Sequence, residues 1–170
     1  MLRGLFARLT ERHDGGRALF GALVRISREP RWYLEGDVPD TIDGRFRVLA
    51  TVLALAMVRL ESGGKAARNE SVALTERFVE AMDTEHRQLG IGDPTLGKTV
   101  RKLVGSLAKR VELWRGVIAG GDWALALRES LYRDIAPSAD ALQSSERRLR
   151  QLWSQLEAAS DEAISQGAVG

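Results

Sequence analysis

The 170-residue sequence contains no cysteine and only two histidines, and these absences exclude several kinds of chemistry. Without cysteine the chain can form neither disulfides nor thiolate metal sites. His86 and Asp83 form one helical i, i+3 pair, whereas helical carboxylate sites use two such pairs, and His13 has no such partner. No serine lies in a nucleophile-elbow motif. We therefore expect no metal site and no cofactor, and nothing in the sequence requires an enzyme.

Long apolar runs are also absent. The longest covers residues 48–58, about half of the roughly 20 residues that a membrane-spanning helix needs. The apolar stretch at the N-terminus is short and interrupted by arginines, so we expect no export signal. These features predict a protein that stays in the cytoplasm, either free or peripheral to the inner membrane.

Charge is unevenly distributed along the chain, although its net value is only +2. Residues 94–117 carry six basic and one acidic side chain, and residues 1–28 carry six and two. The remaining segments are acidic on balance. Basic segments of this kind indicate an anionic partner surface, which could belong to nucleic acid, lipid headgroups or an acidic protein.

Apolar residues recur at intervals of three and four along most of the chain, and no stretch alternates as a strand does. We predict an all-α, single-domain, irregular bundle of about six to seven helices over residues 1–170, with no sheet. The expected helices cover residues 1–14, 17–27, 41–61, 65–89, 94–118, 123–132 and 138–165, and residues 166–170 should fray.

Two of these helices should build much of the core. The helix over 41–61 is apolar around most of its circumference, which is typical of a central helix. The helix over 94–118 has an unbroken apolar stripe that should make it a principal wall of the core: Leu96, Val100, Leu103, Val104, Leu107, Val111 and Trp114. Residues 1–14 form a short basic amphipathic helix that either docks on the core or lies on an anionic membrane surface.

Residues 29–44 have no helical periodicity and contain Pro30, Gly36, Pro39 and Gly44, so we expect a loop. Its aromatic side chains would be costly to expose to water. They either close one end of the bundle or belong to a functional loop. The residues of interest in this loop are Trp32, Tyr33, Asp37, Asp40 and Asp43.

Residues 89–102 support two incompatible interpretations. Gly92 to Thr99 matches Gly-x-x-x-x-Gly-Lys-Thr, the phosphate-binding loop of nucleotide hydrolases. The same stretch also fits a helix stop and a helix start, with Gly90 as a left-handed cap, Asp93 as an N-cap and Pro94 at the first helical position. A phosphate-binding loop follows a buried strand, but here an amphipathic helix precedes it. We therefore favour the helix junction.

The helix after this junction carries Lys98, Arg101, Lys102 and Lys109 on one face. These cations either bind a partner or form salt bridges with the acidic helices over 65–89 and 138–165. No aromatic stacking platform accompanies them, so sequence-specific RNA recognition is unsupported. Gly97 and Gly105 lie close to one side of the helix and could allow another helix to approach.

Two stretches, WYLEGDVPDTIDGRF at 32–46 and GIGDPTLGKTVRK at 90–102, together resemble the ubiquinol–cytochrome c chaperone family. The resemblance covers about residues 15–135. It implies a non-enzymatic assembly factor for the cytochrome b subunit of ubiquinol–cytochrome c reductase, with no catalytic residues. Mitochondrial relatives carry targeting and membrane-associated extensions. We expect this chain to lack them, so it resembles a bacterial member. The resemblance also implies which residues shape the start of the basic helix and give it its charge. These residues of the second motif are Gly92, Asp93, Gly97, Lys98 and Lys102.

The resemblance also suggests partners. The mitochondrial relatives act with a small partner protein at the ribosomal exit tunnel and hold newly made cytochrome b. Our hypothesis is a helical chaperone that docks on an acidic or membrane-proximal partner through Lys98, Arg101, Lys102 and Lys109, with the loop over 32–43 alongside. The alternatives are a ribosome- or RNA-binding module and a nucleotide hydrolase.

Overall fold

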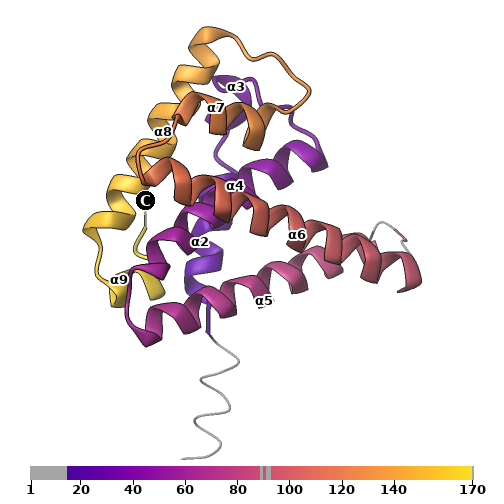
Figure 1. The fold of residues 1–170 in the computed structure, drawn as a ribbon. Helices are drawn as coiled ribbons and strands as arrows, with labels where there is room; N and C mark the ends of the chain where they lie inside the picture. The colour runs from indigo at the N-terminus through magenta and orange to yellow at the C-terminus, as the bar shows by residue number, and fades with distance from the viewer. Residues whose placement is uncertain (1–14, 89, 91–92, 170) are drawn as a thin grey trace, which may run out of the picture.

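The computed structural model describes residues 15–88, 90 and 93–169, and helices without any strand make up the regular structure of that part (Figure 1). The predicted all-α class is therefore confirmed. The helix expected at the N-terminus lies outside the described residues. The elements are α2 (Arg17–Ser27), α3 (Arg31–Leu34), α4 (Ile42–Glu61), α5 (Lys65–Gln88), α6 (Asp93–Ile118), α7 (Trp123–Leu127), the π-helix η1 (Arg128–Tyr132), α8 (Ala139–Ala158) and α9 (Asp161–Ser165).

Helix α4 is the centre of the fold, as its apolar circumference predicts. It contacts α2, α5, α6, η1 and α8, and every residue from Val48 to Ala56 is buried. Because neighbours cover it on all sides, α4 has no solvent-facing stripe over these two turns. The other helices place their apolar faces against it, and the buried side chains form one contiguous cluster.

Side-chain caps fix where several helices begin. The Thr41 hydroxyl accepts from the Gly44 N–H at the start of α4, and the Asp122 carboxylate accepts from the Leu125 N–H at the start of α7. Ser138 caps α8 in the same way. These caps satisfy backbone donors that have no partner within the helix. Most boundaries predicted from the sequence are therefore confirmed within one or two residues.

Two glycines are required by close backbone approaches. Gly16 precedes α2 with a φ of 74°, and a Cβ there would lie 2.9 Å from the carbonyl carbon of Ala73. A Cβ on Gly44 would lie 1.8 Å from the carbonyl oxygen of Pro39. The first glycine lets α2 pack against α5 and the second lets the loop fold back on α4, so neither position has room for a side chain.

Three sequence predictions are wrong in detail. The segment over 29–44 is not all loop, because α3 forms one helical turn within it. The last helix is broken after Ala158, and Ser160 caps a separate α9. The tail does not fray through residue 169, because Val169 and Ile164 are buried in the core. Each of these features depends on tertiary contacts that the local pattern does not contain.

Helices α5 and α6 form an antiparallel pair whose joined ends project beyond the rest of the fold (Figure 1). Among the stripe residues whose side chains the structure describes, those that are buried lie in the second half of α6, at Leu107, Val111 and Trp114. Val100, Leu103 and Val104 are only half-buried. The first half of α6 extends past the body of the fold and is therefore not the wall of the core that its periodicity predicts.

Candidate functional site

The aromatic residues of the 32–46 motif are held by the fold. Trp32 is buried; its indole N–H donates to the Ile26 carbonyl at 2.8 Å, and the Arg148 guanidinium lies 5.0 Å from its ring centroid. The Tyr33 hydroxyl donates to the Ser27 carbonyl at 2.8 Å. Both side chains therefore tie α3 to the end of α2.

The three carboxylates of the motif also have internal partners. Asp37 accepts from the backbone N–H and the hydroxyl of Ser138, and these hydrogen bonds lower the pKa of its carboxyl. Asp40 pairs with Arg45 at 2.7 Å, a hydrogen bond that likewise lowers the Asp40 pKa. Asp43 pairs with Arg47 at 2.6 Å. Asp37 thus joins the loop before α4 to the start of α8, whereas Asp43 pairs within α4 itself.

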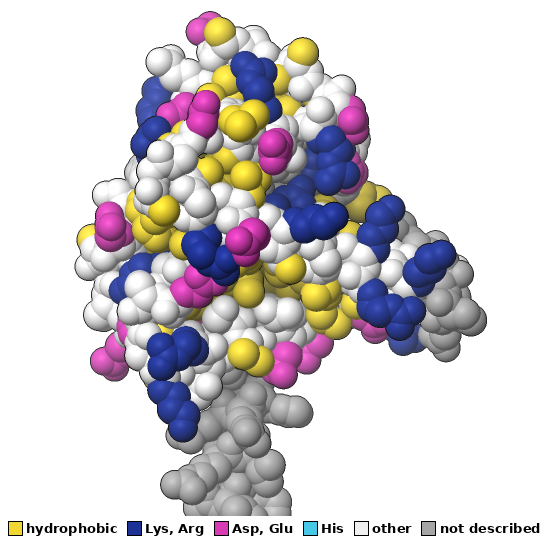
Figure 2. All heavy atoms as spheres, viewed as in Figure 1, with side chains coloured by type: hydrophobic (Ala, Val, Ile, Leu, Met, Phe, Trp, Pro, Cys, Tyr) yellow, Lys and Arg dark blue, Asp and Glu magenta, His cyan; other side chains and the backbone are white. Residues whose placement is uncertain are grey.

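The predicted basic residues of α6 lie together on its exposed face. Lys98, Arg101, Lys102 and Lys109, here called the α6 basic row, are all exposed, and none forms an ion pair with any residue that the structure describes. By contrast, Arg115 farther along α6 pairs with Glu61 at 2.7 Å. Figure 2 shows the Lys and Arg side chains gathered over the projecting end of the α5–α6 pair. The alternative of salt bridges to α5 or α8 is therefore not seen among the residues that the structure describes.

The junction before α6 has the geometry of a helix stop. Gly90 adopts a φ of 76° after the end of α5, as a left-handed cap does. A helix, not a strand, precedes it. Gly92 and the side chain of Asp93 lie outside the described residues. A Cβ on Gly97 or Gly105 would meet nothing within 4 Å, so no described helix of this chain makes the predicted close approach.

A hollow of about 400 Å³ opens between α4, α5 and α6, beside the basic row. Its walls carry the apolar side chains of Ile42, Phe46, Met82 and Leu103. Six charged residues also line it: Asp43, Arg47, Glu85, Lys102, Arg110 and Arg133. We call it the arginine hollow, because three of its four cations are arginines. Lys102 belongs to both the hollow and the α6 basic row.

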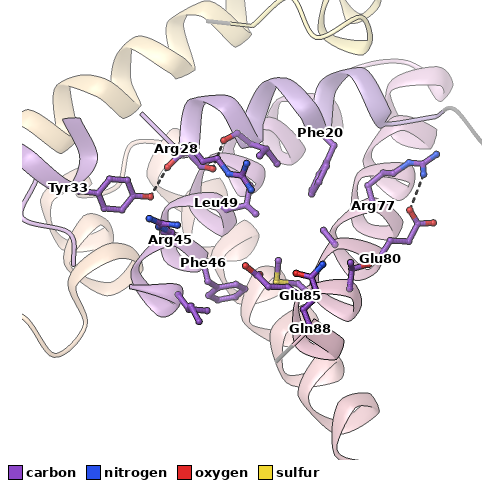
Figure 3. Close-up of a pocket in the computed structure, with 16 residues that line it drawn as sticks. Phe20, Arg28, Tyr33, Arg45, Phe46, Leu49, Arg77, Glu80, Glu85 and Gln88 are labelled. Carbon is purple, nitrogen blue, oxygen red and sulfur yellow. Dashed lines mark hydrogen bonds and ion pairs between the residues drawn. The ribbon is translucent and has the colours of Figure 1, made fainter. Parts of the chain in front are cut away.

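A second hollow, of about 520 Å³, lies on the other side of Phe46 and Met82, between α2, α4 and α5 (Figure 3). The two share Ile42, Phe46, Met82 and Glu85 as lining residues. Arg77 and Glu80 pair at its edge. The two hollows thus meet at Phe46 and Met82, and this concave surface was not predicted.

The deepest charged group of the arginine hollow is Arg110. Its side chain is turned inward and is 6% exposed. Its guanidinium lies 5.6 Å from the Phe46 ring centroid and reaches the Ser130 carbonyl of η1. The one available signal is that Arg110 lies between Leu107 and Val111 on the apolar stripe of α6.

The described part of the chain offers no metal centre. It contains no group of three or more His, Asp or Glu side chains that could hold a metal ion. Within the same residues no helix is both long enough and apolar enough to cross a membrane. The α6 basic row and the arginine hollow beside it are therefore the candidate functional surface.

Comparison with known proteins agrees with the resemblance of the two motifs. The chain is similar to a crystal structure of the Cbp3 homolog from Brucella abortus, with 26% identity and a TM-score of 0.83 over 100% of this chain and 96% of that one. No match was found among curated proteins. The family model described as ubiquinol-cytochrome C chaperone matches residues 35–169. The chain therefore belongs to the ubiquinol–cytochrome c chaperone family.

Proposed function

We propose that this protein is a non-enzymatic chaperone for the cytochrome b subunit of ubiquinol–cytochrome c reductase, and that it binds this client through the α6 basic row. The family match supports a role in the assembly of that complex. The observation that carries the binding mode is the row itself, whose four exposed cations have no ion-pair partner among the described residues.

The physical argument is that unpaired surface cations cost little in a free protein and attract an acidic partner. Lys98, Arg101 and Lys102 lie on two successive turns, so their fields add along one face of the helix. Such a face steers association and fixes orientation more than it adds affinity. The Trp32 to Asp43 segment contributes on this proposal by holding α4 and its neighbours, because its side chains are engaged within the fold.

The test is a variant with Lys98, Arg101, Lys102 and Lys109 all changed to Gln, expressed in cells that lack the native gene. We expect less assembled ubiquinol–cytochrome c reductase and less cytochrome b than with the native chain. The matched control changes four exposed cations outside α6 that likewise have no recorded ion pair, namely Arg25, Lys65, Arg128 and Arg147. Normal cytochrome b levels in cells lacking the gene altogether would contradict the proposed function.

The unpaired row also favours a second candidate, a ribosome- or RNA-binding module. Binding through phosphate contacts loses affinity steeply as salt rises. Co-sedimentation of the tagged protein with ribosomes at several salt concentrations tests it, using the same two variants. An association that does not depend on salt, or none at all, removes this candidate and leaves the protein client.

A further inference from the structure

Arg110 places a positive charge inside the fold without a carboxylate partner among the described residues. Its Nη1 donates to the carbonyl and the hydroxyl of Ser106, and its Nη2 donates to the Ser130 carbonyl at 2.9 Å. All three acceptors are neutral. Its Nε is buried and has no hydrogen-bond partner. A guanidinium has five donor hydrogens in a fixed plane, so part of its donor capacity is unused here.

The neighbouring charges raise the free-energy cost of a positive charge at this position. Burial, together with the nearby charges of Arg133 and Arg47, lowers the pKa of Arg110 to about 10. Asp43 opposes this shift, but its carboxylate is mostly exposed and is paired with Arg47. Lys102 and Glu85 are the other charged groups lining the hollow. Four cations therefore face two carboxylates, and the most buried cation has no carboxylate of its own.

A buried charge without a counter-charge is costly, because the surroundings do not replace the water it has lost. An anion bound in the hollow would reduce this cost by pairing with Arg110 and Arg133, which both line it. The same arginines would bind a neutral ligand more weakly, because such a ligand has no negative charge to pair with them.

The rest of the arginine hollow is apolar and of a size that suits a small molecule. Phe46, Met82 and Leu103 line it beside the cations, and about 400 Å³ lies within the range of small-ligand pockets. Because Arg110 is nearly buried, a slim ligand can reach it more readily than the broad surface of a protein. The second hollow, past Phe46 and Met82, offers room for a longer aliphatic chain.

We propose that the arginine hollow binds a small amphipathic carboxylate, with its carboxylate toward Arg110 and Arg133 and its aliphatic chain against Phe46, Met82 and Leu103. This site goes beyond the proposed chaperone function and does not depend on it. The ligand class is a fatty-acid-like monoanion, whose two parts match the cationic and the apolar sides of the hollow.

The test uses the purified full-length protein with decanoate and with decanol, its neutral counterpart, each below its aggregation concentration. We expect decanoate to raise the melting temperature and to shift the NMR signals of residues around Phe46 and Met82, and decanol to bind at least tenfold more weakly. Arg110→Met should weaken decanoate binding at least tenfold. Arg147→Met is the matched control, because it removes an exposed cation of α8 that lines neither hollow and should leave binding unchanged.

A second variant keeps the test decisive if Arg110→Met does not fold. Arg133 is exposed, so its side chain can be shortened without loss of core packing, and Arg133→Asn should weaken decanoate binding several-fold. Equal binding of decanoate and decanol, or unchanged decanoate binding by both variants, would overturn the proposal. So would a glutamate-bearing apolar peptide that binds this hollow while decanoate does not, since the site would then serve a protein segment.

Discussion

The Tyr132 hydroxyl donates a 2.7 Å hydrogen bond to the carbonyl of Gly36, 96 residues earlier in the chain. The same hydroxyl lies 2.8 Å from the Ser145 hydroxyl. Helices η1 and α8 and the loop over 35–41, here called the motif loop, therefore meet at one buried oxygen. Ser138 and Asp37 join the loop to the start of α8 nearby. The conformation of the motif loop is therefore determined by the second half of the chain.

Tyr132→Phe should destabilise the protein by about 1–3 kcal/mol, because it leaves the buried Gly36 carbonyl and Ser145 hydroxyl short of a partner. The free energy of unfolding in urea measures this change. Tyr33→Phe is the control, since it also removes one hydroxyl that donates to a backbone carbonyl, but in a half-buried place. Its cost should be smaller because water can replace the lost donor; equal costs would contradict this reasoning.

Arg59→Met should destabilise the protein by about 1.5–3 kcal/mol and loosen the C-terminal segment, since hydrogen bonds from a charged donor are the stronger ones. Arg59 is nearly buried, and it donates to the Leu156 and Ala159 carbonyls at 2.9 and 2.8 Å and pairs with Asp161. These contacts hold α9 where the last helix breaks. Amide hydrogen exchange around Ile164 should accelerate in the variant.

Arg115→Met is the matched control for that substitution. Arg115 pairs with Glu61 and Glu112, but its side chain is 45% exposed. A surface ion pair of this kind contributes about 0–1 kcal/mol. If Arg115→Met proved as costly as Arg59→Met, the difference in burial would not explain the stability of the α8–α9 segment.

The parts of the fold that the sequence predicts well are those determined by local patterns. The apolar circumference of α4, the starts of α4 and α7, and the left-handed Gly90 are each encoded within a few neighbouring residues. The exposed α6 basic row follows from helical periodicity in the same way. Its function is not encoded in that periodicity and remains a proposal.

The features that were missed depend on distant partners. Trp32 is anchored by the Ile26 carbonyl and by Arg148 of α8, so α3 forms without any periodicity of its own. Arg110 is turned inward because Ser130 of η1 accepts its hydrogen bond. Val169 is buried because the tail returns to the core. None of these contacts can be read from the residues on either side.

Glu70→Gln should stabilise the protein at pH 7. Burial raises the pKa of the Glu70 carboxyl, hydrogen bonds from Gly16 and Ser165 oppose this only in part, and its Oε1 has no partner. A raised folded-state pKa means that stability is greatest below the ordinary value of 4.5 and is lost as pH rises through the folded value. The gain from Gln should therefore disappear as pH falls below about 4.5.

Thermal unfolding of both proteins at pH 4, 5.5 and 7 measures this difference. Glu76→Gln makes the same change of charge at an exposed position of α5 and corrects for net charge. A gain for Glu70→Gln that persisted unchanged at pH 4 would show that the ionised carboxylate is not its cause.

Gly97→Ala should stabilise the protein by about 0.5–1 kcal/mol, because Gly97 lies within α6 and a Cβ there meets nothing within 4 Å. Gly44→Ala is the contrast, since its Cβ would overlap the Pro39 carbonyl and should destabilise the fold strongly. Denaturant unfolding measures both.

Gly97→Ala also separates helix geometry from recognition. If the variant is more stable and still supports assembly of ubiquinol–cytochrome c reductase, Gly97 is needed neither for the geometry of α6 nor for recognition by a partner. If it is more stable but fails in assembly, a partner must approach α6 closely at Gly97, next to Lys98 and Arg101.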